Sequence, residues 1–130
     1  MPTPTEYLKH TSVIIVTGGS SGIGCSIIKA IMKLAPTATV CNLSRSKPGD
    51  FFVERGLRLP TNLRDSGAVA AAAGRLNTII AAAVAGVVLS FHNSGFVDYG
   101  RLHVSDRSKQ FRMVDLTVRA VVPLTARFLL

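Results

Sequence analysis

The chain has 130 residues, of which 48% are hydrophobic and 17% charged, so it is long enough for one globular domain and is unlike a disordered protein. Its net charge of +8 is spread along the sequence without a basic run interleaved with aromatic residues, which argues against nucleic-acid binding. Cys25 and Cys41 lie in apolar segments without histidines at metal-ligand spacing, so we expect two buried, reduced thiols and no metal site.

The first predicted elements are a strand and a helix joined by glycines. Residues 1–10 contain no signal peptide, because no apolar segment follows a basic one, and we expect a cytoplasmic protein. Residues 12–17 form a β-branched apolar run that predicts a buried strand, and the glycine-rich residues 18–24 predict a turn. A helix is predicted over residues 23–34, ending before Pro36, because apolar side chains recur there at helical spacing: Ile23, Ile27, Ile28, Ile31 and Leu34.

Strands and helices then continue in alternation. Residues 38–43 and 56–59 predict two strands. The residues between them include Pro48 and Gly49 and predict a loop, and a loop with some helix is the alternative. Residues 66–85 are alanine-rich and predict a helix, which Gly74 weakens, and residues 87–91 predict an apolar strand covered on both faces. A last helical stretch opens at Ser105 and extends towards residue 130, with a kink expected at Pro123.

The apolar run 76–91 is the one candidate for a membrane span. It is shorter than the roughly 20 residues that a bilayer requires, and Arg75 and Asn77 stand at its start. Gly86 separates an alanine-rich part from a valine-rich part. We therefore expect a helix followed by a strand, and no membrane partner.

Strands that alternate with helices predict an α/β fold, namely a Rossmann-like doubly wound parallel sheet with right-handed crossovers and strand order 3-2-1-4. No internal repeat or linker divides the sequence, so residues 1–130 are expected to form a single domain. The strand of residues 87–91 would be an exposed apolar edge if no fifth strand covers it.

The glycine turn carries the strongest functional signal. The residues between the first strand and the first long helix are Thr17-Gly18-Gly19-Ser20-Ser21-Gly22-Ile23-Gly24. Glycine permits a positive φ and a close approach of the backbone to a pyrophosphate, and the amides of a helix start attract phosphate charge. The hydroxyls of Ser20 and Ser21 can donate to the phosphate or cap the helix. The strand–turn–helix context therefore predicts a dinucleotide site.

The spacing Gly18-x-x-x-Gly22-x-Gly24 resembles the Thr-Gly-x-x-x-Gly-Ile-Gly signature of the short-chain dehydrogenases/reductases at every fixed position. Four further segments extend this resemblance over most of the chain: Asn42-Leu43-Ser44-Arg45, Asn62-Leu63-Arg64-Asp65 with Asn in place of the family's Asp, His92-Asn93-Ser94-Gly95 for the family's Asn-Asn-Ala-Gly, and Phe111-x-Met113-x-Asp115-Leu116-Thr117.

The resemblance implies that residues 1–130 are the N-terminal, NAD(P)-binding portion of such a protein, truncated after the fourth strand and the following helix. It also implies which residues bind the cofactor: Gly18, Ser20, Ser21, Gly22, Ile23, Gly24, Ser44, Arg45, Asn62, Leu63, Asn93, Ser94 and Gly95.

The end of the second strand indicates which nicotinamide cofactor is bound. Dinucleotide folds place there a carboxylate for the ribose 2′-hydroxyl or an arginine for a 2′-phosphate. This chain has no acid from Val40 to Lys47, and it has Ser44, Arg45 and Lys47 instead. Because a guanidinium binds phosphate in bidentate fashion, NADP(H) is favoured. The alternatives are NAD(H) and an Arg45 that is only a surface residue.

The catalytic residues of the family are a serine, a Tyr-x-x-x-Lys pair and an asparagine on the preceding helix. Thr11 and His103 stand four residues after Tyr7 and Tyr99, so neither tyrosine is followed by the lysine. Thr117 stands at the asparagine position, and the family's serine and tyrosine are expected beyond residue 130. We therefore predict no catalytic residue in this chain. His92 and His103 are alternative proton donors, although lone histidines are more often structural.

Two functions follow from these patterns. The first is an oxidoreductase that transfers hydride between NADP(H) and a carbonyl or alcohol substrate of unknown identity. The second is a non-catalytic nucleotide-binding or partner-interaction module. A homo-oligomer through the last helix or the exposed edge strand is also an expectation, and no nucleic-acid partner is expected.

Overall fold

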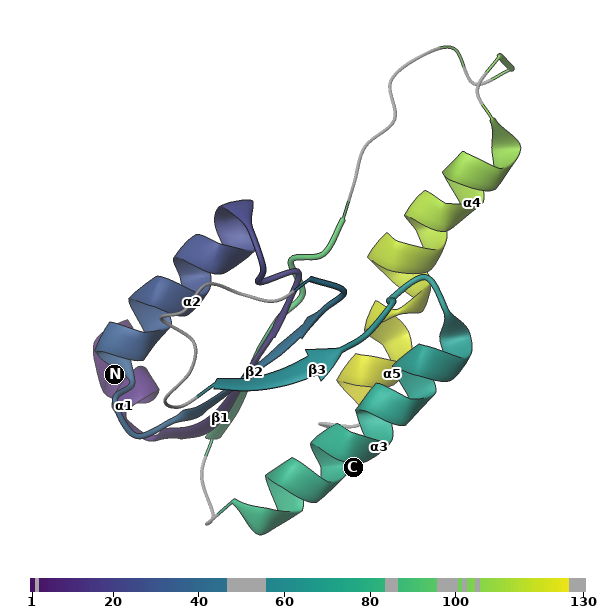
Figure 1. Cartoon of the computed structure of the whole chain (residues 1–130). Helices are drawn as coiled ribbons and strands as arrows, with labels where there is room; N and C mark the ends of the chain where they lie inside the picture. The colour runs from purple at the N-terminus through teal and green to yellow at the C-terminus, as the bar shows by residue number, and fades with distance from the viewer. Residues whose placement is uncertain are drawn as a thin grey trace.

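The computed structural model describes residues 1, 3–46, 56–83, 87–95, 101, 103–104 and 106–126. Within these residues four strands form one sheet in the order β3-β2-β1-β4, and every neighbouring pair is parallel (Figure 1). The strands are β1 (Thr11–Thr17), β2 (Thr39–Ser44), β3 (Gly56–Pro60) and β4 (Val87–Phe91). The predicted α/β class and strand order are confirmed, and the glycine turn follows the carboxyl end of β1.

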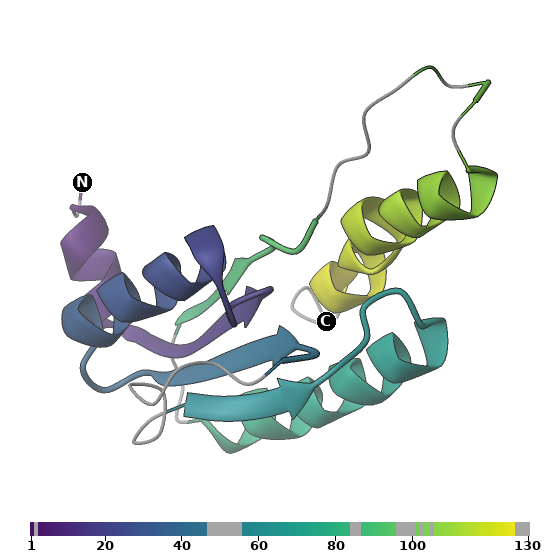
Figure 2. The same cartoon turned by 45° about the horizontal axis from the view of Figure 1, so that its top comes forward.

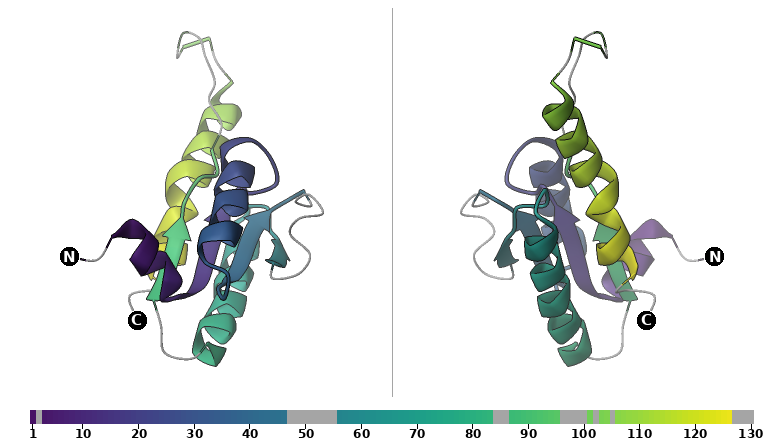
Figure 3. Two further views of the ribbon diagram at one scale, coloured as in Figure 1. Left: turned by 90° about the vertical axis from the view of Figure 1, so that its left-hand side faces the viewer. Right: turned by 90° about the vertical axis from the view of Figure 1, so that its right-hand side faces the viewer.

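Helices cover both faces of this sheet, which the two panels of Figure 3 show from opposite sides. On one face lie α1 (Pro4–Lys9) and α2 (Gly22–Leu34), and on the other lie α3 (Ser66–Ala82) and α5 (Val121–Ala126) (Figure 2). α4 (Arg107–Val114) and the π-helix η2 (Asp115–Arg119) lead into α5. The sheet is thus doubly wound, as the alternation of elements predicts.

The hydrophobic core consists of two clusters, one on each face of the sheet. In β1, Val13 and Ile15 pack with α3 and α5, whereas Ile14 and Val16 pack with α2. Successive side chains of a strand point to opposite faces, so a strand that is covered on both faces is apolar throughout. This burial explains the uninterrupted apolar run that identifies β1 in the sequence.

α1 is an element that the sequence patterns above did not predict. Thr3 and Glu6 form a capping box, because the Thr3 hydroxyl accepts from the Glu6 amide while the Glu6 carboxylate accepts from the Thr3 amide. The hydrogen bonds from the backbone and side chain of Thr3 lower the pKa of Glu6. Pro4 occupies the first helical position, where its missing N–H costs nothing. Leu8 then packs against the α2 side of the core.

The apolar run 76–91 divides between two elements, as predicted. α3 ends at Ala82, and β4 begins at Val87. α3 begins at the N-cap Asp65, whose carboxylate accepts from the amides of Gly67 and Ala68. Gly86 lies outside the described residues. Within the described part of the chain, no helix is both long and apolar enough to cross a membrane.

The last helical stretch is interrupted by the π-helix η2, whereas the sequence predicts a kink at Pro123. The amide of Ala120 donates to the carbonyl of Asp115 over 2.9 Å, a wider turn than an α-helix makes. Pro123 supplies the reason, because it has no N–H to donate to Arg119 and its ring crowds that carbonyl. The interruption therefore falls one turn before the proline. The predicted start at Ser105 and residues 127–130 lie outside the described residues, as do Pro48 and Gly49.

The burial of α2 differs from the prediction at one cysteine, and two residues of its apolar pattern are exposed. Ile23 and Leu34 fall at the predicted helical spacing but are 74% and 42% exposed. Cys25 was expected to be buried like Cys41, yet it is only half-buried. The buried face of α2 is instead centred on Gly24, Ile28 and Ile31. It includes a glycine because α2 packs against the backbone of the glycine turn.

Candidate functional site

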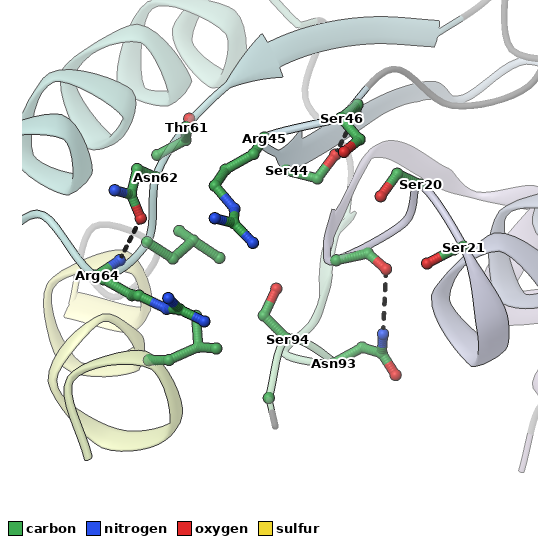
Figure 4. Close-up of a pocket in the computed structure, with 14 residues that line it drawn as sticks. Ser20, Ser21, Ser44, Arg45, Ser46, Thr61, Asn62, Arg64, Asn93 and Ser94 are labelled. Carbon is green, nitrogen blue, oxygen red and sulfur yellow. Dashed lines mark hydrogen bonds between the residues drawn. The ribbon is translucent and has the colours of Figure 1, made fainter. Parts of the chain in front are cut away.

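A polar cavity of about 350 Å³ lies at the carboxyl ends of the strands (Figure 4). Ten of the thirteen predicted cofactor-binding residues line it: Gly18, Ser20, Ser21, Ser44, Arg45, Asn62, Leu63, Asn93, Ser94 and Gly95. The structure thus brings together four segments that are far apart in the sequence. The other three, Gly22, Ile23 and Gly24, form the first turn of α2 and are not part of the lining. Four further lining residues were not predicted: Ser46, Thr61, Arg64 and Leu116.

The glycine turn has its shape for two separate reasons. Gly18 and Gly22 have φ values of +70° and +58°, which side chains other than glycine rarely adopt. Gly24 is required by packing, because a Cβ there would overlap the carbonyl oxygen of Gly18. This close contact fixes α2 against the end of β1. The start of α2 therefore sits beside the cavity.

The start of α2 is open to a ligand. Ser21 is its N-cap residue, but within the described residues no side chain accepts from the first amides of the helix. Of the two roles that the sequence allows for the Ser21 hydroxyl, the helix cap is not observed. Ser20 and Ser21 line the cavity instead. Amides of a first helical turn have no acceptor within their own helix, and together with the helix dipole they attract an anion.

A hydrogen-bond network joins the glycine turn to the end of β2. The amide of Gly19 donates to Oδ1 of Asn42 over 2.9 Å, and Nδ2 of Asn42 donates to the hydroxyl of Ser44 over 2.9 Å. That hydroxyl donates in turn to the carbonyl of Ser46 over 2.8 Å. Asn42 is fully buried. Asn42 was not among the predicted cofactor-binding residues, although a polar residue between the apolar Cys41 and Leu43 was the available signal.

A second network joins β1 to the segment after β4. The hydroxyl of Thr17 accepts from the amides of Asn93 and Ser94, each over 3.0 Å. The side chain of Asn93 also donates to the carbonyl of Gly18 over 3.4 Å. These bonds hold residues 93–95 against the glycine turn. The wall of the cavity formed by Asn93, Ser94 and Gly95 is thereby fixed to the strand that carries the turn.

The charged side chains of the described lining are those of Arg45 and Arg64, and it includes no carboxylate. Figure 4 shows the Arg45 side chain extending into the space between the other labelled residues. Nη2 of Arg58, on β3, donates to the backbone carbonyl of Arg45 over 3.2 Å and so supports this position. Lys47 lies outside the described residues. The lining is therefore suited to a polyanion.

The part of the cavity lined by Asn62 combines a side-chain amide with apolar side chains. Oδ1 of Asn62 accepts from the Arg64 amide over 3.2 Å, which fixes the loop after β3. Leu63 and Leu116 line the cavity beside it. This arrangement suits the flat, partly apolar base of a nucleotide.

The histidines and the other residues compared with the family's catalytic positions lie outside the described lining of the cavity. Nε2 of His92 lies 3.1 Å from the Thr125 hydroxyl, so His92 connects the end of β4 to α5. Its pKa is lowered by partial burial, which favours the neutral ring. Tyr7 and His103 are exposed, as is Thr117 on η2, and none of the four belongs to the described lining. Tyr99 lies outside the described residues.

No protein-family model and no curated protein sequence matches this chain. Its fold, however, matches solved structures of short-chain dehydrogenases/reductases. One from Burkholderia vietnamiensis is 31% identical, with a TM-score of 0.80 over 91% of this chain and 56% of that protein. The NADPH-bound carbonyl reductase from chicken fatty liver is 18% identical, with a TM-score of 0.75 over 92% of this chain and 51% of that protein.

A 3-ketoacyl-(acyl-carrier-protein) reductase from Brucella melitensis, solved with NADH, is 21% identical, with a TM-score of 0.73 over 92% of this chain and 49% of that protein. This chain therefore spans about half the length of these proteins. It has the fold of an N-terminal portion of a short-chain dehydrogenase/reductase.

Proposed function

We propose that this chain, which has the fold and the glycine motif of the N-terminal part of short-chain dehydrogenases/reductases, binds NADP(H) in the cavity at the carboxyl ends of its strands. One observation carries the proposal. The glycine turn, the uncapped start of α2 and the Arg45 side chain all border the same cavity, whose described lining holds no carboxylate. A dinucleotide with an additional phosphate matches this set of donors.

Each part of the cofactor has a proposed partner. The pyrophosphate would be bound by Gly18, Ser20, Ser21 and the amides of the first turn of α2, which includes Gly22, Ile23 and Gly24. Arg45, together with the backbone near Ser44, would receive the 2′-phosphate. Asn62 and Leu63 would hold the adenine, and residues 93–95 would border the ribose on the nicotinamide side.

The bound nicotinamide would supply or accept hydride, and the residues of this chain would bind and orient it. The reaction proposed for the whole protein is hydride transfer between NADP(H) and a carbonyl or alcohol substrate. The second candidate function is nucleotide binding without catalysis. It is favoured by one observation, namely that Thr11 and His103 stand where a lysine would have to follow Tyr7 and Tyr99.

Self-association through the last helical segments is a further proposal about partners. Phe111, Val114, Val118 and Val122 are exposed and recur every three or four residues along α4, η2 and α5. Such spacing forms an apolar stripe on one side of a helix. Sedimentation of the wild-type chain and of Val118→Glu would test this, because a charge within the stripe should shift a dimer to monomer.

Cofactor binding is tested by titrating the purified chain with NADPH and with NADH. We expect tighter binding of NADPH, and we expect Arg45→Ala to reduce this preference by roughly 1.5–3 kcal/mol, the contribution of one hydrogen-bonded charged pair. Arg75→Ala, on the exposed side of α3 and outside the cavity lining, is the control for the change in net charge. An unchanged ratio in Arg45→Ala would contradict the NADP(H) assignment.

A further inference from the structure

The network around Asn42 assigns a role to a residue that does not line the cavity. Asn42 is fully buried in β2, where it stands between the apolar residues Cys41 and Leu43. Because the Gly19 amide can only donate, the atom that faces it must be Oδ1 of Asn42. Nδ2 therefore faces Ser44, as observed. The orientation of the Asn42 amide is fixed by the chemistry of its partners.

The same network restricts Ser44. A serine hydroxyl has one proton, and that of Ser44 is donated to the Ser46 carbonyl. The hydroxyl oxygen accepts from Asn42. Ser44 lines the cavity, yet it has no proton left for a phosphate while this network is intact. Its hydroxyl acts on the backbone of its own loop.

Arg45 stands in the sequence between Ser44 and Ser46, which are hydrogen-bonded to each other. The Ser44 hydroxyl donates to the Ser46 carbonyl, and the Arg58 side chain donates to the carbonyl of Arg45 itself. At the other end of the network, the Gly19 amide belongs to the turn that would bind the pyrophosphate. The network thus connects the two phosphate-binding parts of the cavity through the interior of the sheet.

We propose that Asn42 and Ser44 are positioning residues that couple the glycine turn to Arg45, and that they set the preference for a 2′-phosphate without contacting the cofactor. This inference rests on the proposed function, because the selectivity concerns the same cavity. Arg45 is exposed on a loop, so its guanidinium is aligned only as well as its backbone is held. Loss of the network should therefore reduce NADPH affinity more than NADH affinity.

The experiment is a double-mutant cycle of Asn42→Leu and Ser44→Ala, with dissociation constants for NADPH and NADH measured on each variant. We expect each single variant to reduce the NADPH preference about tenfold, which corresponds to about 1.4 kcal/mol. Because both residues act in one network, the double variant should lose no more than either single variant. Additive losses would instead make Ser44 a direct ligand and overturn the proposal. Thr78→Val removes a hydroxyl that donates to a carbonyl on α3, and it is the control.

A second measurement distinguishes a loss of folding, a failure of the proposed cofactor binding and a failure of the positioning role. Asn42→Leu leaves the buried Gly19 amide without its acceptor, and Ser44→Ala leaves Nδ2 of the buried Asn42 without its own acceptor, so urea unfolding is measured for both variants. Ser44→Ala retains the bond between Gly19 and Asn42, so we expect it to be the less destabilised of the two. Amide NMR shifts of Arg45 and Ser46 should move in Ser44→Ala, even without nucleotide. If they do not move, the positioning role is wrong. If the wild-type chain binds neither dinucleotide, the proposed function fails, and these shifts alone decide whether the network positions Arg45.

Discussion

The hydroxyl oxygen of Thr17 accepts a hydrogen bond from the backbone amide of Ser94 over 3.0 Å, which ties the last residue of β1 to the segment after β4. The adjacent amide of Asn93 donates to the same oxygen. Thr17 is buried and residues 93 and 94 are half-buried, so loss of this acceptor would leave two partly shielded amides without a protein partner. One side-chain atom therefore holds a wall of the cavity.

Thr17→Val, which keeps the shape of the side chain and removes the acceptor, should lower the free energy of unfolding by about 1–3 kcal/mol. Thr17→Ser retains the hydroxyl and is the control. Urea unfolding of both variants measures the difference. Equal midpoints for the two variants would show that the hydroxyl contributes nothing to the stability of this segment.

Two glycines in helices should respond in opposite ways to a methyl group. Gly24→Ala places a Cβ against the carbonyl of Gly18, so we expect a loss of about 1–3 kcal/mol in stability, together with weaker nucleotide binding. Gly74 lies in α3, where an added Cβ would be more than 4 Å from the packed neighbours that the structure describes. Gly74→Ala should therefore raise stability by about 0.5–1 kcal/mol. Thermal unfolding distinguishes them, and a stabilising Gly24→Ala would contradict the close packing of α2.

Stability should fall at high pH because of one buried thiol. Burial raises the pKa of Cys41 to about 11, and the charge of Arg75 offsets part of this increase. The unfolded chain releases the thiol proton near pH 9, whereas the folded chain retains it. The contribution of Cys41 is therefore complete below pH 9 and declines by about 1.4 kcal/mol per pH unit up to pH 11.

Cys41→Val should remove this slope, which urea unfolding between about pH 8 and 10.5 would measure. Thiol labelling gives an independent check, because half-buried Cys25 should react with a disulfide reagent in the folded chain, whereas Cys41 should react only after unfolding. Equal labelling rates for the two thiols would contradict the burial difference.

The 130-residue chain should bind NADPH without turning over a carbonyl substrate. Turnover needs a proton donor next to the nicotinamide, and loss of general acid catalysis typically costs about 10²–10⁴-fold. The measurement is NADPH oxidation by the purified chain with a panel of ketones, quinones and aldehydes. Steady multiple turnover would refute this expectation and direct attention to His92, His103 or another group.

The fold could be predicted from the sequence because its signals are local. Apolar runs of five or six residues identified β1 and β4, and the glycines between β1 and α2 marked where the first strand ends and the helix begins. The last helical segments were harder, since the effect of Pro123 appears one turn earlier, at a carbonyl that no local pattern marks. The exposure of Ile23 and Leu34 had no local signal, because Gly24 of α2 packs against Gly18 and a tertiary contact leaves no periodic pattern in the sequence.

The residues of the candidate site that belong to a sequence motif could be predicted, whereas the residues that contribute through the interior of the sheet could not. Gly18 was predicted from the glycine turn, Arg45 from the end of the second strand, and Asn93 from the resemblance to the family, and all three line the cavity. Leu116 was missed as a lining residue because it lies on η2, and no sequence pattern shows that this helical stretch borders the cavity. Arg64 was missed although it directly follows the predicted residues Asn62 and Leu63. Asn42 was missed because its partners, Gly19 and Ser44, become apparent only when β2 lies beside β1.

The register of the sheet also has a consequence for the order of folding. β1 pairs with β2 through residues about 25 positions apart, as in Val13 with Thr39, and with β4 through residues about 75 positions apart, as in Ile14 with Leu89. Closing the longer loop costs about 0.9 kcal/mol more in chain entropy. We therefore expect β1, β2 and β3 to assemble first and β4 to join late. Since the Thr17 bonds to residues 93 and 94 form only then, the nucleotide cavity would be completed in the last steps of folding, and bound nucleotide would slow unfolding from the β4 side.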